Sequence, residues 1–232
     1  MEKEVEKIFE DEKILVISKP SGLVVNRSNT YKKVTLQDIL EMDYPDIFDG
    51  IDDDQYISRS GVVHRLDKDT SGVVVVAKDP ESFYFLQRQF KNRKTFKEYV
   101  FISHGIIQDE IIEIDAPLGR NPKNPLKRAV VSSGKSAFTK IEIERVSEID
   151  SHTYTLGRAF PKTGRTHQIR VHLSAIGHSI VGDGIYCPKN LLEIGLETFG
   201  RMMLHAKILG IISPSDNKFH RFESPLPKEF KI

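Results

Sequence analysis

Cysteine is almost absent from this sequence of 232 residues, and so are extended apolar stretches. With Cys187 alone, neither an intramolecular disulfide nor a cysteine-rich zinc site can form. No apolar run approaches the roughly 20 residues that a membrane-spanning helix needs, and the charged residues 1–7 lack the apolar core of a signal peptide. The sequence therefore predicts a cytosolic protein that has no membrane segment.

The motifs of common metal and cofactor sites are missing as well. There is no HExxH, no GxxxxGKS or GxxxxGKT and no GxGxxG. His167 and His172 stand five positions apart, which does not place two ligands on one face of a helix. The aspartates of residues 43–55 lack a recognised ligand spacing, so this segment is predicted to be an exposed acidic connection. We expect no metal ion and no cofactor.

Length and composition fit one soluble globular domain. Apolar residues make up 39% of the sequence and charged residues 29%, which is ordinary for such a protein. A chain of this length can bury a substantial core. We therefore predict a single domain over residues 1–232, with its core between about residues 8 and 230, and a monomeric protein.

The net charge is only +1, but the charges are unevenly distributed. Residues 1–60 contain 14 Asp and Glu against 8 Lys and Arg, a balance of −6, whereas residues 88–140 contain 11 Lys and Arg against 5 Asp and Glu, a balance of +6. A basic segment in a nearly neutral protein is typical of a surface that binds the phosphates of nucleic acid. It also fits a solvated surface on which charges cluster by chance, and the charges alone do not choose between the two.

The most distinctive segment is residues 61–77, where a polar cluster precedes the most apolar run of the sequence. Val73–Ala77 shows no polar alternation, which predicts a strand buried on both faces. Asp67 then lies on a loop that a rigid strand anchors, and such loops often carry functional residues. Turn-forming residues alone would fit a plain turn, but the adjacent His64 and Arg65 favour a functional site.

A second polar cluster lies at residues 161–173, in a predicted turn that opens a helix. A carboxylate that stays ionised in a partly dry site needs a cation, and arginine provides it best through two parallel hydrogen bonds. Arg165 and Arg170 of this cluster are candidate partners for Asp67, and Arg65 is a third. An aspartate held in this way could act as nucleophile or general base, whereas a structural ion pair is the alternative.

The remaining pattern predicts more strands than helices, without regular alternation between them. Strands are expected at residues 13–18, 73–77, 96–103, 138–146, 154–160 and 202–210. Helices are expected at residues 34–41, at 80–92 after an Asp79 cap, and from a Thr166 cap to Gly177. Residues 119–128 are predicted to be a basic loop interrupted by prolines. This order favours the α+β class, with a mixed, largely antiparallel central sheet flanked by a few helices and loops.

The run Asp67-Lys68-Asp69-Thr70 invites comparison with the DxDxT signature of haloacid-dehalogenase-type phosphatases, which use an aspartyl nucleophile and magnesium. Thr70 follows the second aspartate immediately, however, which is the wrong spacing. The strand also follows the cluster here, whereas it precedes the cluster in those enzymes. We therefore set the phosphatase interpretation aside.

Five segments together resemble the RluA-type pseudouridine synthases. Residues 64–72, His-Arg-Leu-Asp-Lys-Asp-Thr-Ser-Gly, match the HRLD-x-x-TSG signature of that family in full. The other segments match in the expected order: residues 14–22 its N-terminal strand and turn, 97–99 its K-x-Y strand, 164–173 its third motif with Asp183 and Tyr186 after it, and 203–206 its C-terminal Leu-His-Ala strand. Many members carry an N-terminal S4 RNA-binding domain, which is not expected here.

The resemblance implies the pseudouridine synthase catalytic fold and roles for several residues. Asp67 would be the catalytic aspartate, Tyr99 would stack on the target uracil, and Arg170 would form a salt bridge with Asp67. Arg65 would fill the gap that the target nucleotide leaves when it is flipped out of the RNA. No role is implied for His64. The other residues expected to contact RNA are Lys97, Lys127, Arg128, Arg165 and His167.

The implied reaction breaks the N1–C1′ bond of a uridine, rotates the uracil and rejoins it through C5, without a metal or cofactor. Asp67 could attack C1′ or first abstract a ribose proton, and the sequence leaves both routes open. Ribosomal RNA and transfer RNA are both candidate substrates, and no obligatory protein partner is expected. The alternative is a non-catalytic RNA-binding or ribosome-assembly protein on the same scaffold, which would not require the set Asp67, Tyr99 and Arg170.

Overall fold

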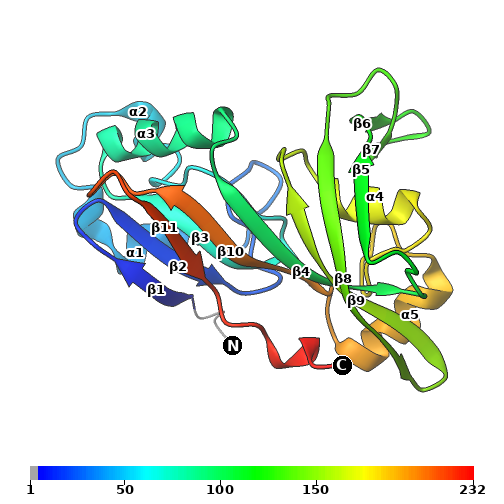
Figure 1. Ribbon diagram of the computed structural model, residues 1–232. Helices are drawn as coiled ribbons and strands as arrows, with labels where there is room; N and C mark the ends of the chain where they lie inside the picture. The colour runs from blue at the N-terminus through cyan, green and yellow to red at the C-terminus, as the bar shows by residue number, and fades with distance from the viewer. Residues whose placement is uncertain (1–4) are drawn as a thin grey trace. The chain divides into compact units, whose positions relative to one another are not determined.

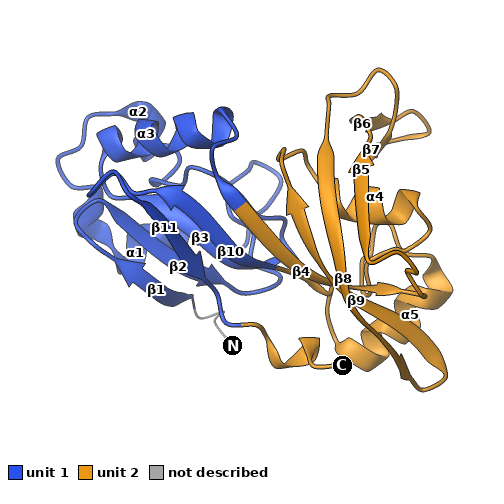
Figure 2. Cartoon of the chain, in the orientation of Figure 1, with its two compact units in different colours: residues 1–96, 206–225 blue, residues 97–205, 226–232 orange. Residues whose placement is uncertain are grey.

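The computed structural model describes residues 5–232 and divides into two compact units (Figure 2). Unit 1 contains the chain up to Phe96 together with Ala206–Pro225, and unit 2 contains Lys97–His205 and Leu226–Ile232. The boundary falls inside two strands, one that begins at Phe96 and one that contains His205. The single domain expected from the sequence stays a prediction, because this division does not show whether the two units unfold together.

Unit 1 is built on antiparallel strands (Figure 1). These strands are β1 (Glu6–Glu10), β2 (Ile14–Lys19), β3 (Ser71–Ala77), β10 (Leu204–Ile212) and β11 (Phe219–Glu223). Hydrogen-bonded neighbours follow the order β1-β2-β3-β10, and β11 pairs with β10. The helices of this unit are α1 (Leu36–Asp43), η1 (Pro45–Ile47), α2 (Asp54–Ile57) and α3 (Pro80–Lys91).

The strand β3 lies at the centre of the core of unit 1. All of its residues are buried, which confirms the strand predicted from the valine run. On one face, Val73 and Val75 pack in a cluster with Phe83 and Leu86 of α3. Each fully buried valine contributes roughly 1.5–3 kcal/mol through the hydrophobic effect. The strand is therefore a rigid base for the loop that precedes it.

The helix α3 begins where the sequence predicts. Asp79 is its cap, since Oδ1 accepts a hydrogen bond from the Ser82 N–H (2.8 Å), and Pro80 occupies the first turn. Asn92 caps the other end. The apolar stripe that contains Phe83 faces the core, as its spacing predicts.

The acidic segment 43–55 differs from the prediction, because it contains η1 and the start of α2. Asp53 caps α2 through a hydrogen bond from the Tyr56 N–H to Oδ1 (2.8 Å). The hydroxyl of the fully buried Tyr56 donates to the carbonyls of Ile47 (2.9 Å) and Ala77 (3.1 Å). One aromatic side chain thus ties the segment to the sheet, a tertiary contact that an acidic composition does not indicate.

Unit 2 contains a further set of antiparallel strands in the order β4-β9-β8-β5. Their bounds are β4 (Phe96–His104), β5 (Ile111–Asp115), β8 (Phe138–Ile149) and β9 (His152–Pro161). The helices are α4 (Gln168–Ala175), α5 (Lys189–Phe199) and η2 (Lys228–Phe230). The α+β class with a largely antiparallel sheet is confirmed. No helix within residues 5–232 is long and apolar enough to cross a membrane.

Residues 119–128, predicted to be a loop, form most of a hairpin instead. Its strands are β6 (Leu118–Asn121) and β7 (Asn124–Val130). The side-chain oxygen of Asn121 accepts a hydrogen bond from the Asn124 N–H (3.2 Å) and closes the turn. Pro122 lies in this turn and Pro125 lies where the ladder is irregular. Neither proline interrupts a paired position, so two prolines are compatible with the hairpin.

The cap of α4 is His167, not the predicted Thr166. His167 has a left-handed backbone (φ 58°) and makes no side-chain cap bond. The side chain of Gln168 stabilises the turn, since its Oε1 accepts a hydrogen bond from the Arg165 N–H (3.0 Å). Gly177 (φ 89°) follows the end of the helix, as predicted.

Candidate active site

The loop that carries Asp67 runs from the end of α2 to the start of β3 in unit 1 (Figure 1). Leu66 and Thr70 are buried, whereas Asp67 is half-buried and Arg65 is exposed. The Thr70 N–H donates to the Asp67 carbonyl (3.2 Å) and closes a turn directly before β3. Buried neighbours on both sides therefore fix the backbone of Asp67 to the core.

The turn after β2 supports the residues that follow Asp67. The ammonium group of Lys19, which is fully buried, donates to the carbonyls of Leu23 (2.9 Å) and Lys68 (3.1 Å). The Gly22 N–H also donates to the Lys68 carbonyl (2.8 Å). A buried cation surrounded by carbonyl oxygens makes strong hydrogen bonds. The sequence predicted a turn here but gave Lys19 no part in the site.

A tight reversal of the chain precedes the same loop. Ser60 (φ 48°) and Gly61 (φ 68°) both adopt the left-handed backbone conformation. A Cβ atom at Gly61 would lie 2.2 Å from the Ala77 carbonyl oxygen, so only glycine fits beside β3. Ser60 is not a glycine and is strained in this conformation. Its position therefore depends on the groups that hold its side chain.

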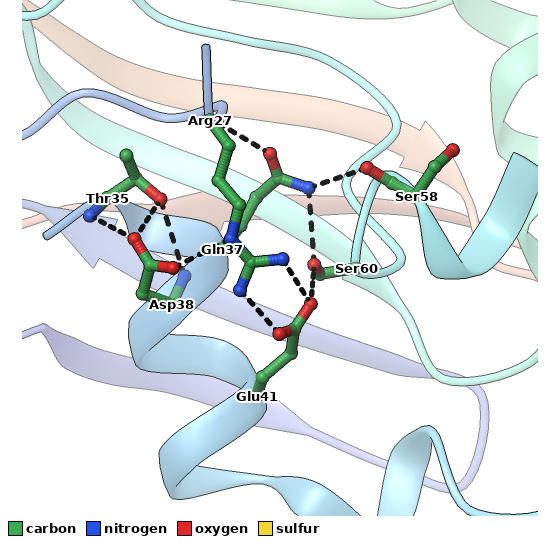
Figure 3. Close-up of polar contacts among 7 residues, drawn as sticks. All are labelled: Arg27, Thr35, Gln37, Asp38, Glu41, Ser58 and Ser60. Carbon is green, nitrogen blue, oxygen red and sulfur yellow. Dashed lines mark hydrogen bonds and ion pairs between the residues drawn. The ribbon is translucent and has the colours of Figure 1, made fainter. Parts of the chain in front are cut away.

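Figure 3 shows the polar network that holds Ser60. Its hydroxyl donates to Glu41 Oε1 (2.6 Å) and lies 3.2 Å from the donating Gln37 Nε2. Arg27 donates to Asp38 Oδ1 (2.7 Å) and to Glu41 Oε1 (2.8 Å). The hydrogen bond from Arg27 holds the pKa of Glu41 below its ordinary value. This guanidinium is paired with two carboxylates in the network that supports the loop.

Tyr99 and Lys97 lie in the part of β4 that belongs to unit 2. Tyr99 is half-buried and lies opposite Ala159 of β9. Lys97 is two residues away and therefore lies on the same face of the strand. Its ammonium group donates to the Thr163 carbonyl (3.1 Å), in the turn before α4. This hydrogen bond links β4 to the second polar cluster, at residues 161–173.

Arg170, on α4, forms a buried ion pair with Asp183 within unit 2. Its Nε and Nη2 atoms lie 2.7 Å from the two carboxylate oxygens of Asp183. Arg170 is 4% exposed and Asp183 is fully buried. The carboxylate also accepts a hydrogen bond from the Ile185 N–H (2.9 Å). The arginine is therefore fixed in one orientation, and the salt bridge expected between it and Asp67 stays a prediction.

Tyr186 connects this ion pair to other predicted RNA contacts. The guanidinium of Arg170 lies 5.3 Å from the centre of the Tyr186 ring. The Tyr186 hydroxyl accepts a hydrogen bond from the Arg128 N–H (2.9 Å) and contacts Nδ1 of His167 (2.9 Å). The Lys127 ammonium donates to the Ile185 carbonyl (2.6 Å). Unit 2 thus brings Arg170, His167, Lys127 and Arg128 into one network.

The β6–β7 hairpin and Arg165 contribute further cationic residues to unit 2. Leu126, in β7, is 93% exposed, and Lys123 and Arg120 of the hairpin are also exposed. Arg165 is half-buried and donates through Nε to the Ser136 carbonyl (3.1 Å).

Within residues 5–232, no group of three or more His, Cys, Asp or Glu side chains is arranged to hold a metal ion.

The chain is similar to proteins of one family over most of its length. Residues 13–175 match the family model described as RNA pseudouridylate synthase. A ribosomal large subunit pseudouridine synthase D from Pseudomonas aeruginosa is 40% identical over 98% of this chain and 70% of its own length. An RNA pseudouridine synthase from Bacillus subtilis, YlyB, itself uncharacterised, is 36% identical over 95% of this chain and 69% of its own length.

A solved structure has the same fold. The human RNA pseudouridylate synthase domain-containing protein 1 superposes with a TM-score of 0.78 at 28% identity, over 97% of this chain and 84% of the human one. The chain belongs to the RNA pseudouridylate synthase family. It is accordingly an isomerase that converts uridine in RNA to pseudouridine.

Proposed function

We propose that this enzyme modifies specific uridines of ribosomal RNA and that Asp67 is its catalytic aspartate. The observation that carries the proposal is the support of the Asp67 loop, which a buried lysine and a buried strand hold from both sides. Catalysis by a positioned group requires such rigidity. The ribosomal substrate is supported by the names of relatives such as the Pseudomonas aeruginosa protein. Transfer RNA is the alternative substrate.

In the proposed reaction, Asp67 acts at the ribose of the target uridine, either by attack on C1′ or by removal of a ribose proton. The N1–C1′ bond breaks, the uracil rotates, and a C5–C1′ bond forms while N1 takes up a proton and C5 loses one. On the first route the Asp67–C1′ bond breaks as C5 bonds to C1′, and on the second route the ribose regains its proton. Tyr99 stacks on the uracil, and Arg170 pairs with the Asp67 carboxylate.

The target base leaves the helical stack, which costs roughly a few kcal/mol. Arg65, which is exposed, occupies the gap that remains in the RNA. The phosphates are bound by residues of unit 2, namely Lys97, Lys127, Arg128, Arg165 and His167. Because such contacts release counterions, affinity for RNA falls as the salt concentration rises. The cytosolic location and the monomeric state expected from the sequence stay predictions.

The role of Asp67 is tested by tritium release from RNA that contains C5-tritiated uridine. We expect Asp67→Asn and Asp67→Ala to lower the rate by at least about 10⁴-fold, the scale seen when a triad residue is removed from a serine protease, while binding of RNA persists. Asp69→Asn, an exposed aspartate in the same loop, is the matched control and should keep full activity. Retention of activity in Asp67→Asn would show that another group performs the chemistry.

A further inference from the structure

The sequence implies no role for His64, but its contacts in unit 1 are specific. Its Nε2 atom accepts a hydrogen bond from the Val75 N–H of β3 (3.1 Å). Val75 is fully buried, and a backbone donor at this depth needs an acceptor. The imidazole therefore satisfies a main-chain group in the centre of the core.

The hydrogen bond from Val75 continues a short ladder along β3. The Ala77 N–H donates to the Gly61 carbonyl (2.9 Å), so the chain enters the loop beside the strand. The N–H two residues earlier, that of Val75, is bonded to the imidazole of His64 and not to a carbonyl. His64 thus marks the point at which the loop to Asp67 separates from the sheet.

The ring of His64 is also fixed from one face. It stacks on Phe90 of α3 with the ring centres 4.5 Å apart and the planes 17° apart. Phe90 packs against the core cluster of unit 1. A neutral imidazole that accepts at Nε2 carries its proton on Nδ1. Phenylalanine would supply the stacking without the acceptor, and glutamine would supply the acceptor without the stacking.

We propose that His64 is a positioning residue for Asp67. It takes no part in bond breaking. It holds the backbone three residues before Asp67 against β3 and α3, and so sets the position of the carboxylate relative to the ribose. A displacement of about 1 Å in a catalytic site can cost on the order of 100-fold in rate. The inference rests on the proposed function, because it requires Asp67 to be the catalytic group.

The test compares His64→Phe, His64→Gln and His220→Phe, a matched control on β11 whose ring lies near the surface. We expect His64→Phe to lower kcat by about 10- to 100-fold, with KM and RNA affinity within about twofold of the wild type. His64→Gln should recover most of this loss, and His220→Phe should leave kcat unchanged. Hydrogen exchange followed by NMR should show faster exchange of the Val75 amide in His64→Phe.

A wild-type kcat in folded His64→Phe would overturn the inference, and so would a loss that His64→Gln does not recover. If His64→Phe does not fold, Phe90→Leu removes the ring stacking and keeps the acceptor. A several-fold lower kcat is then expected, and an unchanged kcat contradicts the inference. Failure of the proposed function is distinguishable, because Asp67→Asn would then keep its tritium release. The exchange rate of the Val75 amide would still measure the contact with His64. An unchanged exchange rate in His64→Phe would by itself overturn the role proposed for His64.

Discussion

The Asp67 loop and the Arg170 cluster are held in place by different kinds of interaction. The loop is held by hydrogen bonds between side chains and the main chain: Lys19 donates to the Lys68 carbonyl, and His64 accepts from the Val75 N–H. The cluster in unit 2 depends on a buried side-chain ion pair between Arg170 and Asp183. We therefore expect a change at Asp183 to lower the free energy of unfolding more than a change at Lys19, and changes at Lys19 and His64 to lower the rate through the position of Asp67.

The largest effect on stability is expected from Asp183→Asn. This change leaves the guanidinium of Arg170 buried beside a neutral amide, and breaking a buried pair typically costs about 3–5 kcal/mol of the free energy of unfolding. Urea unfolding measures the change. The matched control is Asp216→Asn, which breaks an exposed pair with His220 and should change little.

The double variant Arg170→Met with Asp183→Leu tests whether the loss in Asp183→Asn comes from the unpaired buried charge. Apolar side chains of similar size remove both charges, so the double variant should be more stable than Asp183→Asn alone. A wild-type free energy of unfolding in Asp183→Asn would contradict the importance given to the buried pair.

Acid should affect unit 2 through His104. Burial lowers the pKa of this imidazole to about 4, and among the described residues its Nε2 has no hydrogen-bond partner. In the unfolded chain, His104 therefore binds a proton near pH 6.5, whereas in the folded protein it stays neutral until about pH 4. The free energy of unfolding is therefore unaffected by His104 above pH 6.5 and falls as the pH drops toward 4, by up to about 3 kcal/mol. Urea unfolding across this range should be less pH-dependent in His104→Leu, and an equal slope in both proteins would refute the assignment.

Lys19→Met, in unit 1, should lower the free energy of unfolding less than Asp183→Asn does, and it should also lower the rate. The variant keeps the shape of the side chain but leaves the Lys68 carbonyl, next to Asp67, with one donor fewer. We expect about 2 kcal/mol lower stability and a kcat about 10-fold lower. Lys78→Met is the control, because Lys78 bonds to Glu10 and to the Asp11 carbonyl and not to the loop. A normal kcat in Lys19→Met would remove the contrast between the two regions.

Local signals in the sequence were sufficient for β3, α3 and the class of the fold. The valine run has no polar alternation and the Asp79-Pro80 pair is a helix start, so neither needs a distant partner. The β6–β7 hairpin was missed because prolines usually end strands, and here they avoid the paired positions. The helix α2 was missed because its one buried aromatic residue, Tyr56, stands among aspartates.

The site could be predicted only where a motif names its residues. Asp67 stands out because a polar cluster meets a buried strand. Lys19 and Asp183 lie within or next to segments that resemble the family, but the sequence does not show which groups they contact. Their hydrogen bonds arise from tertiary packing. The prediction that Asp67, Tyr99 and Arg170 form one catalytic set stays a prediction.

Mapping of pseudouridine in the RNA of cells that lack the gene tests whether the enzyme modifies ribosomal RNA through Asp67. Complementation with the wild-type gene and with Asp67→Asn completes the comparison. We predict that one or a few uridines of ribosomal RNA lose the modification on deletion, regain it with the wild type and do not regain it with Asp67→Asn. An unchanged pattern in ribosomal RNA after deletion would exclude a ribosomal substrate, and recovery with Asp67→Asn would show that Asp67 is not the catalytic group.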